Sequence, residues 1–110
     1  GVFLASDVSA SKELQGHDIP LGVDARWQYT QFAEVLPPGI LLLATDGLWE
    51  AMDSGKAMFG KERVNTLLAA NAHAGPQQIV DEIFKEVKAF TATAEVEDDR
   101  TVVIVRLDQD

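Results

Sequence analysis

The apolar residues of this chain gather into three short runs that predict β-strands. Residues 2–5 form the first run, after which the polar residues 6–12 follow abruptly. The run at 40–45 carries no charge and predicts a strand buried on both faces. Residues 101–107 are rich in β-branched side chains, which favour a strand at that end of the sequence.

A fourth strand is predicted from a weaker pattern at residues 27–35. Side chains alternate there, although neither face is cleanly apolar. Residues 36–39 read Leu-Pro-Pro-Gly, a strong turn signal. Two strands joined by a short turn form a hairpin, so we expect residues 27–35 to pair with residues 40–45.

Helical periodicity occupies the middle of the chain. One helix is expected to begin near Gly60, with Val64, Leu67 and Leu68 on one face. A second begins at Gly75-Pro76, because proline suits the first position of a helix. The apolar stripe of the second helix comprises Ile79, Val80, Ile83, Phe84, Val87 and Phe90. Strands, two helices and a final strand predict an α+β arrangement in one domain.

Charge and cysteine content narrow the classes of partner. Eighteen acidic and nine basic residues give a net charge of −9, which disfavours nucleic acids and anionic membranes and favours cations or basic partners. The alternative explanation of this excess of acidic residues is an acidic surface that keeps the protein soluble. The chain has no cysteine, which excludes thiolate sites and fits a cytoplasmic protein. No apolar run approaches the roughly 20 residues that span a bilayer.

Two acidic segments are the candidate chemistry. Asp46 ends the run at 40–45, and Gly47 allows a sharp turn there. A second cluster at residues 95–99 runs into the final strand, with Asp98 near its start. Carboxylates suit hard cations such as Mg²⁺ and Mn²⁺, so we hypothesise that the two segments meet around a metal. The alternatives are a turn or helix-capping role for Asp46 and a solvated loop for the cluster.

Other chemistries find little support. Counting from Asp46, an EF-hand would need oxygen donors at positions that hold Leu48 and Ala57. His17 and His73 stand apart in loops, which favours surface or capping roles. The sequence contains no Gly-x-Ser-x-Gly nucleophile motif and no glycine-rich phosphate loop. Trp49 and the apolar stripes are predicted to be core residues.

Several segments together resemble a known family. Residues 45–51 read Thr-Asp-Gly-Leu-Trp-Glu-Ala, 58–64 read Met-Phe-Gly-Lys-Glu-Arg-Val, and 98–103 read Asp-Asp-Arg-Thr-Val-Val. Pro20-Leu21-Gly22 and residues 36–39 precede them in matching order. The set resembles the metal-dependent Ser/Thr protein phosphatases of type 2C. It is most similar to the bacterial branch typified by the sporulation stage II phosphatase and regulators of the general-stress sigma factor.

This resemblance implies a βα sandwich of two antiparallel sheets covered by helices, with a two-metal site at one edge. Water activated by Mn²⁺ or Mg²⁺ would attack a phosphoserine or phosphothreonine, so no side chain acts as nucleophile. Matched by motif, Asp46 and Asp98 would be metal ligands and Asp99 would support them. Gly47 would serve the turn, and Thr101 would start the strand.

One family motif is missing from the sequence. Members carry an upstream Asp followed by Gly-His-Gly-like residues, and this Asp bridges both metals. Residues 7–10 are the nearest imitation, but they lack the glycines and lie too close to Asp46. We therefore expect residues 1–110 to be the C-terminal part of a single phosphatase domain, a partial βα sandwich. Such a piece should bind metal weakly, be inactive by itself and self-associate through its uncovered surfaces.

Three functions remain open at this point. The first is that the parent protein is a phosphatase for a phosphorylated regulatory protein, such as an anti-sigma-factor antagonist. The second is a catalytically degenerate relative that only binds a partner. The third is an unrelated acidic α+β module whose Asp-Gly turns are structural.

Overall fold

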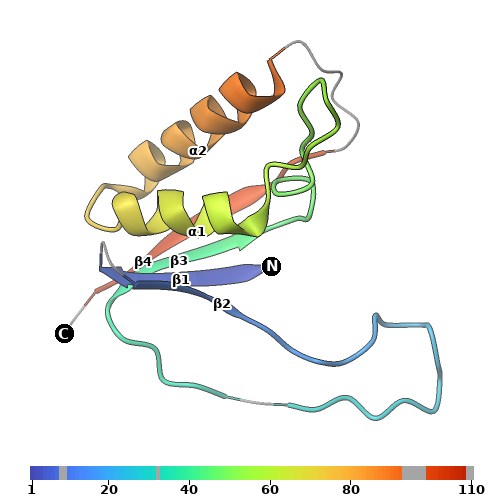
Figure 1. The fold of residues 1–110 in the computed structure, drawn as a ribbon. Coiled ribbons are helices and arrows are strands. Elements are labelled where there is room, and N and C mark those ends of the chain that lie inside the picture. The colour runs from blue at the N-terminus through green and yellow to red at the C-terminus, as the bar shows by residue number, and fades with distance from the viewer. Residues whose placement is uncertain (8–9, 32, 93–98, 109–110) are drawn as a thin grey trace.

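Four strands form one antiparallel sheet in the computed structural model, which describes residues 1–7, 10–31, 33–92 and 99–108. The strands are β1 (Val2–Asp7), β2 (Ala10–Leu14), β3 (Gly39–Ala44) and β4 (Val102–Leu107). Their order across the sheet is β2-β1-β3-β4, and each neighbouring pair is antiparallel. Helices α1 (Lys61–Ala70) and α2 (Pro76–Thr91) lie over one face of the sheet (Figure 1). The predicted α+β class is confirmed.

The core lies between the two helices and the sheet. Val64 and Leu68 of α1 are buried, as the stripe predicted. On α2 the buried side chains are Ile79, Ile83 and Val87, whereas Phe84 at the margin of the stripe is 37% exposed. The sheet contributes Phe3, Ala5, Ile40 and Leu42 to the same cluster. Neither helix is long and apolar enough to cross a membrane, as far as the described residues go.

The prediction that residues 40–45 are buried on both faces is wrong. Ile40 and Leu42 are fully buried beneath the helices, but Leu43 on the other face is 38% exposed. Through the strand register, Leu43 shares this open face with Val2, Leu41, Val103 and Val105. Val103 and Val105 are 49% and 39% exposed. An uncharged run shows that both faces are apolar, but it cannot show what covers each face.

The strand and hairpin predicted at residues 27–35 are also wrong. β3 pairs with β1 and β4 instead, and the described residues of 27–35 join no sheet. Asp18 holds this segment, because its carboxylate accepts hydrogen bonds from Trp27 Nε1 (3.1 Å) and from the amide of Thr30 (3.0 Å). The segment belongs to a long connection between β2 and β3 that extends away from the helices (Figure 1).

β2 was not predicted, because its sequence Ala-Ser-Lys-Glu-Leu is polar. It lies at an edge of the sheet, where charged residues are common because one side of the strand is unpaired. Glu13 accepts from Lys61 of α1 at 2.9 Å, which ties this edge to the helical layer. The polar pattern therefore reflects the position of the strand and does not indicate a loop.

Candidate metal centre

Asp46 lies in an exposed turn directly after β3. The amide of Leu48 donates to the carbonyl of Thr45 (3.2 Å), and the amide of Glu50 donates to the carbonyl of Asp46 (3.0 Å). These bonds form a short turn over residues 46–50, which includes Gly47, where the sequence predicted a sharp turn. Asp46 is exposed, whereas Leu48 is fully buried and anchors the turn in the core. A rigid strand and a buried leucine thus support the carboxylate from both sides.

Two hydrogen bonds tie the start of this turn to the residue before β4. The amide of Thr45 donates to the carbonyl of Thr101 at 3.1 Å. In the other direction, the amide of Thr101 donates to Oγ1 of Thr45, also at 3.1 Å. Thr45 and Thr101 lie one residue beyond the paired Ala44 and Val102. They therefore continue the contact between β3 and β4 up to the acidic residues.

Gly47 lies against the backbone of Asp99. A Cβ added at Gly47 would be 2.1 Å from the Asp99 carbonyl oxygen, which is far inside contact distance. Arg100 adds a further bond, since its Nε donates to the Gly47 carbonyl at 3.3 Å. The glycine expected to serve the turn is thus also required by the close approach of the second acidic segment.

The structure brings together part of the predicted site. The Asp46-Gly47 turn lies beside Asp99 and Arg100, although more than fifty residues separate them in the chain. Thr101 lies one residue before β4, which begins at Val102, so it does not itself start the strand as expected. Asp98 lies outside the described residues, so its assignment as a ligand stays a prediction.

The chemical type of the side chains at this site suits a hard divalent cation. Asp46 and Asp99 are exposed and offer carboxylate oxygens, which Mg²⁺ and Mn²⁺ prefer. No group of three or more His, Cys, Asp or Glu suited to a metal occurs within the described parts of the chain. The carboxylates of Asp46 and Asp99 can contribute to a metal centre at this end of the sheet. Further oxygen ligands are needed to complete it.

The remaining candidate residues lie elsewhere. His73 lines a small cavity with Arg106 and Leu107, at the end of β4 away from Thr101, and His17 is exposed in the long connection. Trp49 packs edge-on against Phe3 with ring centroids 5.7 Å apart, and it borders the buried core. His17 and His73 are both exposed, in agreement with the predicted surface roles, and Trp49 is a partly buried residue packed against the core.

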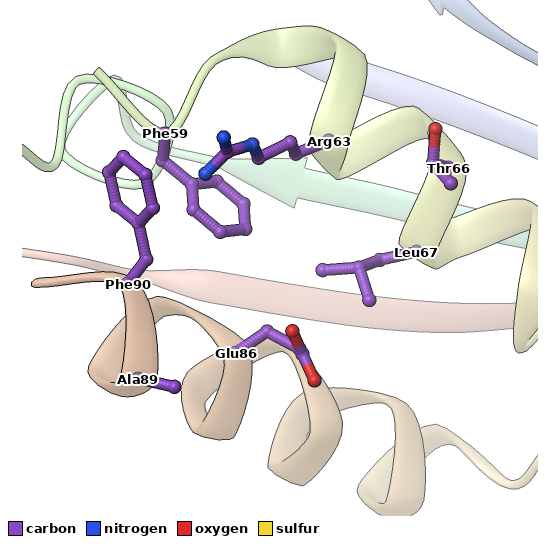
Figure 2. A pocket seen from close by; sticks show the side chains of 7 residues that line it. All are labelled: Phe59, Arg63, Thr66, Leu67, Glu86, Ala89 and Phe90. Atoms are coloured by element: carbon purple, nitrogen blue, oxygen red, sulfur yellow. The ribbon is translucent and has the colours of Figure 1, made fainter. Parts of the chain in front are cut away.

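A separate groove of about 480 Å³ lies between α1 and α2. Figure 2 shows Phe59 and Phe90 at one end, with Arg63 beside them and Glu86 on the opposite wall. The two rings meet edge-on at 5.4 Å, and the Arg63 guanidinium lies 4.3 Å from the centre of the Phe90 ring. Among the described residues of the lining, Glu86 is the only acidic side chain, so this part of the groove does not resemble a metal site.

Thr45 and Arg100 are the residues whose contribution was not foreseen. Both occur inside the motifs quoted above, but no role was given to either. The available signal was a hydroxyl residue between an apolar strand and an aspartate, together with an arginine after the second acidic cluster. Neither signal is specific until the fold shows that the two segments are neighbours.

The sequence model of one family, described as Stage II sporulation protein E (SpoIIE), matches residues 1–108. A comparison with curated proteins gave no match.

Solved structures with the same fold include two kinds of phosphatase domain. The chain is 22% identical to the SiaA-PP2C domain of Pseudomonas aeruginosa, with a TM-score of 0.85, covering 97% of this chain and 43% of that one. It is 24% identical to a structure of the SpoIIE PP2C phosphatase domain with a fragment of the regulatory domain from Bacillus subtilis, with a TM-score of 0.76 and coverage of 99% and 32%.

A third structure is the Bacillus subtilis SpoIIE phosphatase domain presoaked with Mn. The identity is 22% and the TM-score 0.67, and the match covers 99% of this chain and 47% of that one. The chain therefore spans less than half of each of these three solved chains. At these identities, the structural likeness establishes a shared fold.

Proposed function

The chain belongs to the Stage II sporulation protein E family, and from this membership we propose that its parent protein is a metal-dependent protein phosphatase. The observation that carries the proposal is the contact of the Asp46-Gly47 turn with Asp99 and Arg100. That contact puts carboxylates from two distant segments at the same end of the sheet, where β3 ends and β4 begins. The phosphatase domains with the same fold support the assignment.

In this proposal Asp46 and Asp98 are metal ligands, and Asp99 supports them from the adjoining position. When bound, Mn²⁺ or Mg²⁺ supplies an activated water and neutralises the phosphoryl oxygens of a phosphoserine or phosphothreonine. Gly47 keeps its own segment close enough for both carboxylate groups to serve one centre. Thr101, directly before β4, connects the second segment to the strand.

We also propose that the chain is the C-terminal part of the phosphatase domain. The solved relatives are more than twice as long, and the open face of the sheet has exposed valines and leucine. A hollow of about 300 Å³ on this face is lined by Leu43, Val103, Thr45 and Thr101, among others. A second sheet packed there would bury these residues and bring further ligands to the same edge.

The open face also supports the proposal that the isolated chain self-associates. Three aliphatic side chains on neighbouring strands, Leu43, Val103 and Val105, are each more than one-third exposed. Adjacent exposed apolar residues of this kind mark interaction surfaces. In a pure sample the available partner is a second copy of the chain, so the fraction of associated chains should rise with protein concentration.

The proposed substrate is a phosphorylated regulatory protein, and an anti-sigma-factor antagonist is our specific suggestion. It rests on the resemblance to the bacterial branch of the family. The net charge of −9 disfavours a nucleic acid as the substrate.

Hydrolysis of a phosphoserine peptide by the parent protein tests the proposal. We expect release of phosphate with Mn²⁺ or Mg²⁺ and none after chelation. Asp46→Asn should reduce the rate by about 100-fold, because loss of a ligand weakens metal-based charge stabilisation. Asp53→Asn is the matched control, since Asp53 Oδ1 accepts hydrogen bonds from the amides of Gly55 and Ala57 within its own turn. Full activity of the Asp46 variant would refute the metal role.

A degenerate relative that binds a partner without catalysis is the second candidate. The groove of about 480 Å³ between α1 and α2, with the side chains of Phe59, Leu67 and Phe90 in its lining, favours it. The same assay separates the two candidates. A parent protein that binds the phosphorylated peptide but releases no phosphate with either metal would support the binding role.

A further inference from the structure

The contact between Thr45 and Thr101 departs from a regular antiparallel ladder at one atom. In such a ladder, a hydrogen-bonded pair exchanges two bonds between backbone groups. Thr45 donates its amide to the Thr101 carbonyl, as the ladder requires. The return bond from the Thr101 amide ends on the Thr45 hydroxyl oxygen at 3.1 Å. A side-chain oxygen thus takes the position of a backbone carbonyl.

This exchange lets the chain turn away while it stays bonded to the neighbouring strand. The Thr45 carbonyl accepts from the Leu48 amide, which is the first bond of the turn that carries Asp46. The ladder bond and the turn bond therefore use different oxygens of the same residue. A serine could supply both oxygens, but alanine or valine could supply only the carbonyl.

Arg100 makes a second connection across the same junction. Its Nε donates to the Gly47 carbonyl at 3.3 Å, one residue after Asp46. Arg100 is itself partly exposed, so this hydrogen bond lies near the protein surface and not in the core. Together the Thr45 and Arg100 bonds hold the two acidic segments on both sides of Gly47.

We propose that Thr45 and Arg100 are positioning residues, whose hydrogen bonds fix the Asp46 turn against the Asp99 segment so that divalent-cation affinity depends on the Thr45 hydroxyl. This inference rests on the proposed function, because it assumes that the edge holds a metal. Carboxylates from separate segments bind one ion more tightly when their separation is fixed before the ion arrives. Residues that orient ligands by hydrogen bonds commonly change metal affinity by about 10- to 100-fold when replaced.

Four variants of the parent protein test the proposal with Mn²⁺ alone, without substrate. Thr45→Val keeps the side-chain volume but removes the acceptor, and it should weaken Mn²⁺ binding at least about tenfold. Thr45→Ser keeps the hydroxyl and should bind within about twofold of the wild type. Arg100→Met should weaken binding severalfold. Thr66→Val is the control, because the Thr66 hydroxyl donates only to the Glu62 carbonyl on α1.

Electron paramagnetic resonance of free Mn²⁺ gives the affinity of each variant. Amide hydrogen exchange at Thr101, measured on the 110-residue chain, reports the hydrogen bond without any metal. We expect exchange at Thr101 to be at least about tenfold faster in Thr45→Val and unchanged in Thr45→Ser. The serine result separates a hydroxyl effect from general disturbance of the strand.

Wild-type Mn²⁺ affinity in Thr45→Val would overturn the positioning role and leave the proposed function intact. If that variant does not fold, wild-type affinity in Arg100→Met overturns it instead. Unchanged exchange at Thr101 in Thr45→Val would show that the hydroxyl bond is not formed. A parent protein that binds no Mn²⁺, or an Asp46→Asn variant that binds it normally, would refute the proposed function itself.

Discussion

Replacing Gly47 by alanine tests whether the two acidic segments lie as close as the structure places them. The added Cβ would lie 2.1 Å from the Asp99 carbonyl oxygen, whereas real Cβ contacts essentially never fall below 3.0 Å. The backbones must therefore separate by about 0.9 Å, and the atom in the way is backbone, which cannot rotate aside like a side chain.

The expected cost of Gly47→Ala follows from two effects. Overpacking of this kind typically costs about 1–3 kcal/mol. The separation also stretches the bond from Arg100 Nε to the Gly47 carbonyl and the bond between Thr101 and Thr45, which are worth about 1 kcal/mol each. We expect a loss of about 2–4 kcal/mol in the free energy of unfolding. For a domain of this size that lowers the melting temperature by roughly 10 °C or more.

Thermal denaturation followed by circular dichroism measures this loss, with Gly75→Ala as the matched control. A Cβ at Gly75 meets nothing within 4 Å, and its φ of −68° is open to alanine. The control should change stability by less than about 1 kcal/mol. If Gly47→Ala melted within about 2 °C of the wild type, the close approach to Asp99 would be refuted.

Two further predictions concern the core and the open face. Phe59→Ala should cost about 3–5 kcal/mol in urea denaturation, because Phe59 is 4% exposed and packs against Phe90. Phe84→Ala, at 37% exposure, should cost less than half as much, and equal losses would contradict the described core. Val103→Lys should shift the isolated chain toward monomer in light scattering at a stability cost of no more than about 1 kcal/mol. Val23→Lys, in the exposed β2–β3 connection, should leave association unchanged, and a wild-type chain that is monomeric at high concentration would contradict self-association.

The helices and three of the four strands, β1, β3 and β4, could be predicted because their signals are local. Pro76 and the stripe on α2 determine a helix whatever surrounds it, and the β-branched run of β4 determines a strand. The wrong and missed strand predictions concern segments whose structure depends on whether a neighbouring strand pairs with them. Residues 27–35 alternate like a strand, yet Asp18 binds the Thr30 amide and the Trp27 side chain, and no neighbouring strand pairs with the segment. β2 is polar, yet it pairs with β1 at an edge of the sheet.

The candidate site shows the same division between local and long-range information. Asp46 and Gly47 could be singled out from the sequence, because a charge after an apolar run and a following glycine are local features. The meeting of the two acidic segments was a hypothesis from the sequence, and the register of β3 and β4 brings Gly47 to Asp99. The role of the Thr45 hydroxyl could not be predicted, because it depends on a hydrogen bond to a residue 56 positions later.

Paramagnetic broadening by Mn²⁺ tests the central claim most directly. Mn²⁺ would be added in small steps to isotope-labelled parent protein while its amide resonances are recorded. The claim that both acidic segments serve one metal centre predicts that the amides of Gly47 and Arg100 broaden together, at the lowest Mn²⁺ concentrations and before those of exposed acidic residues on α2 such as Asp81. Broadening of only one of the two segments, or of Asp81 as early as Gly47, would contradict a shared metal centre at this edge of the sheet.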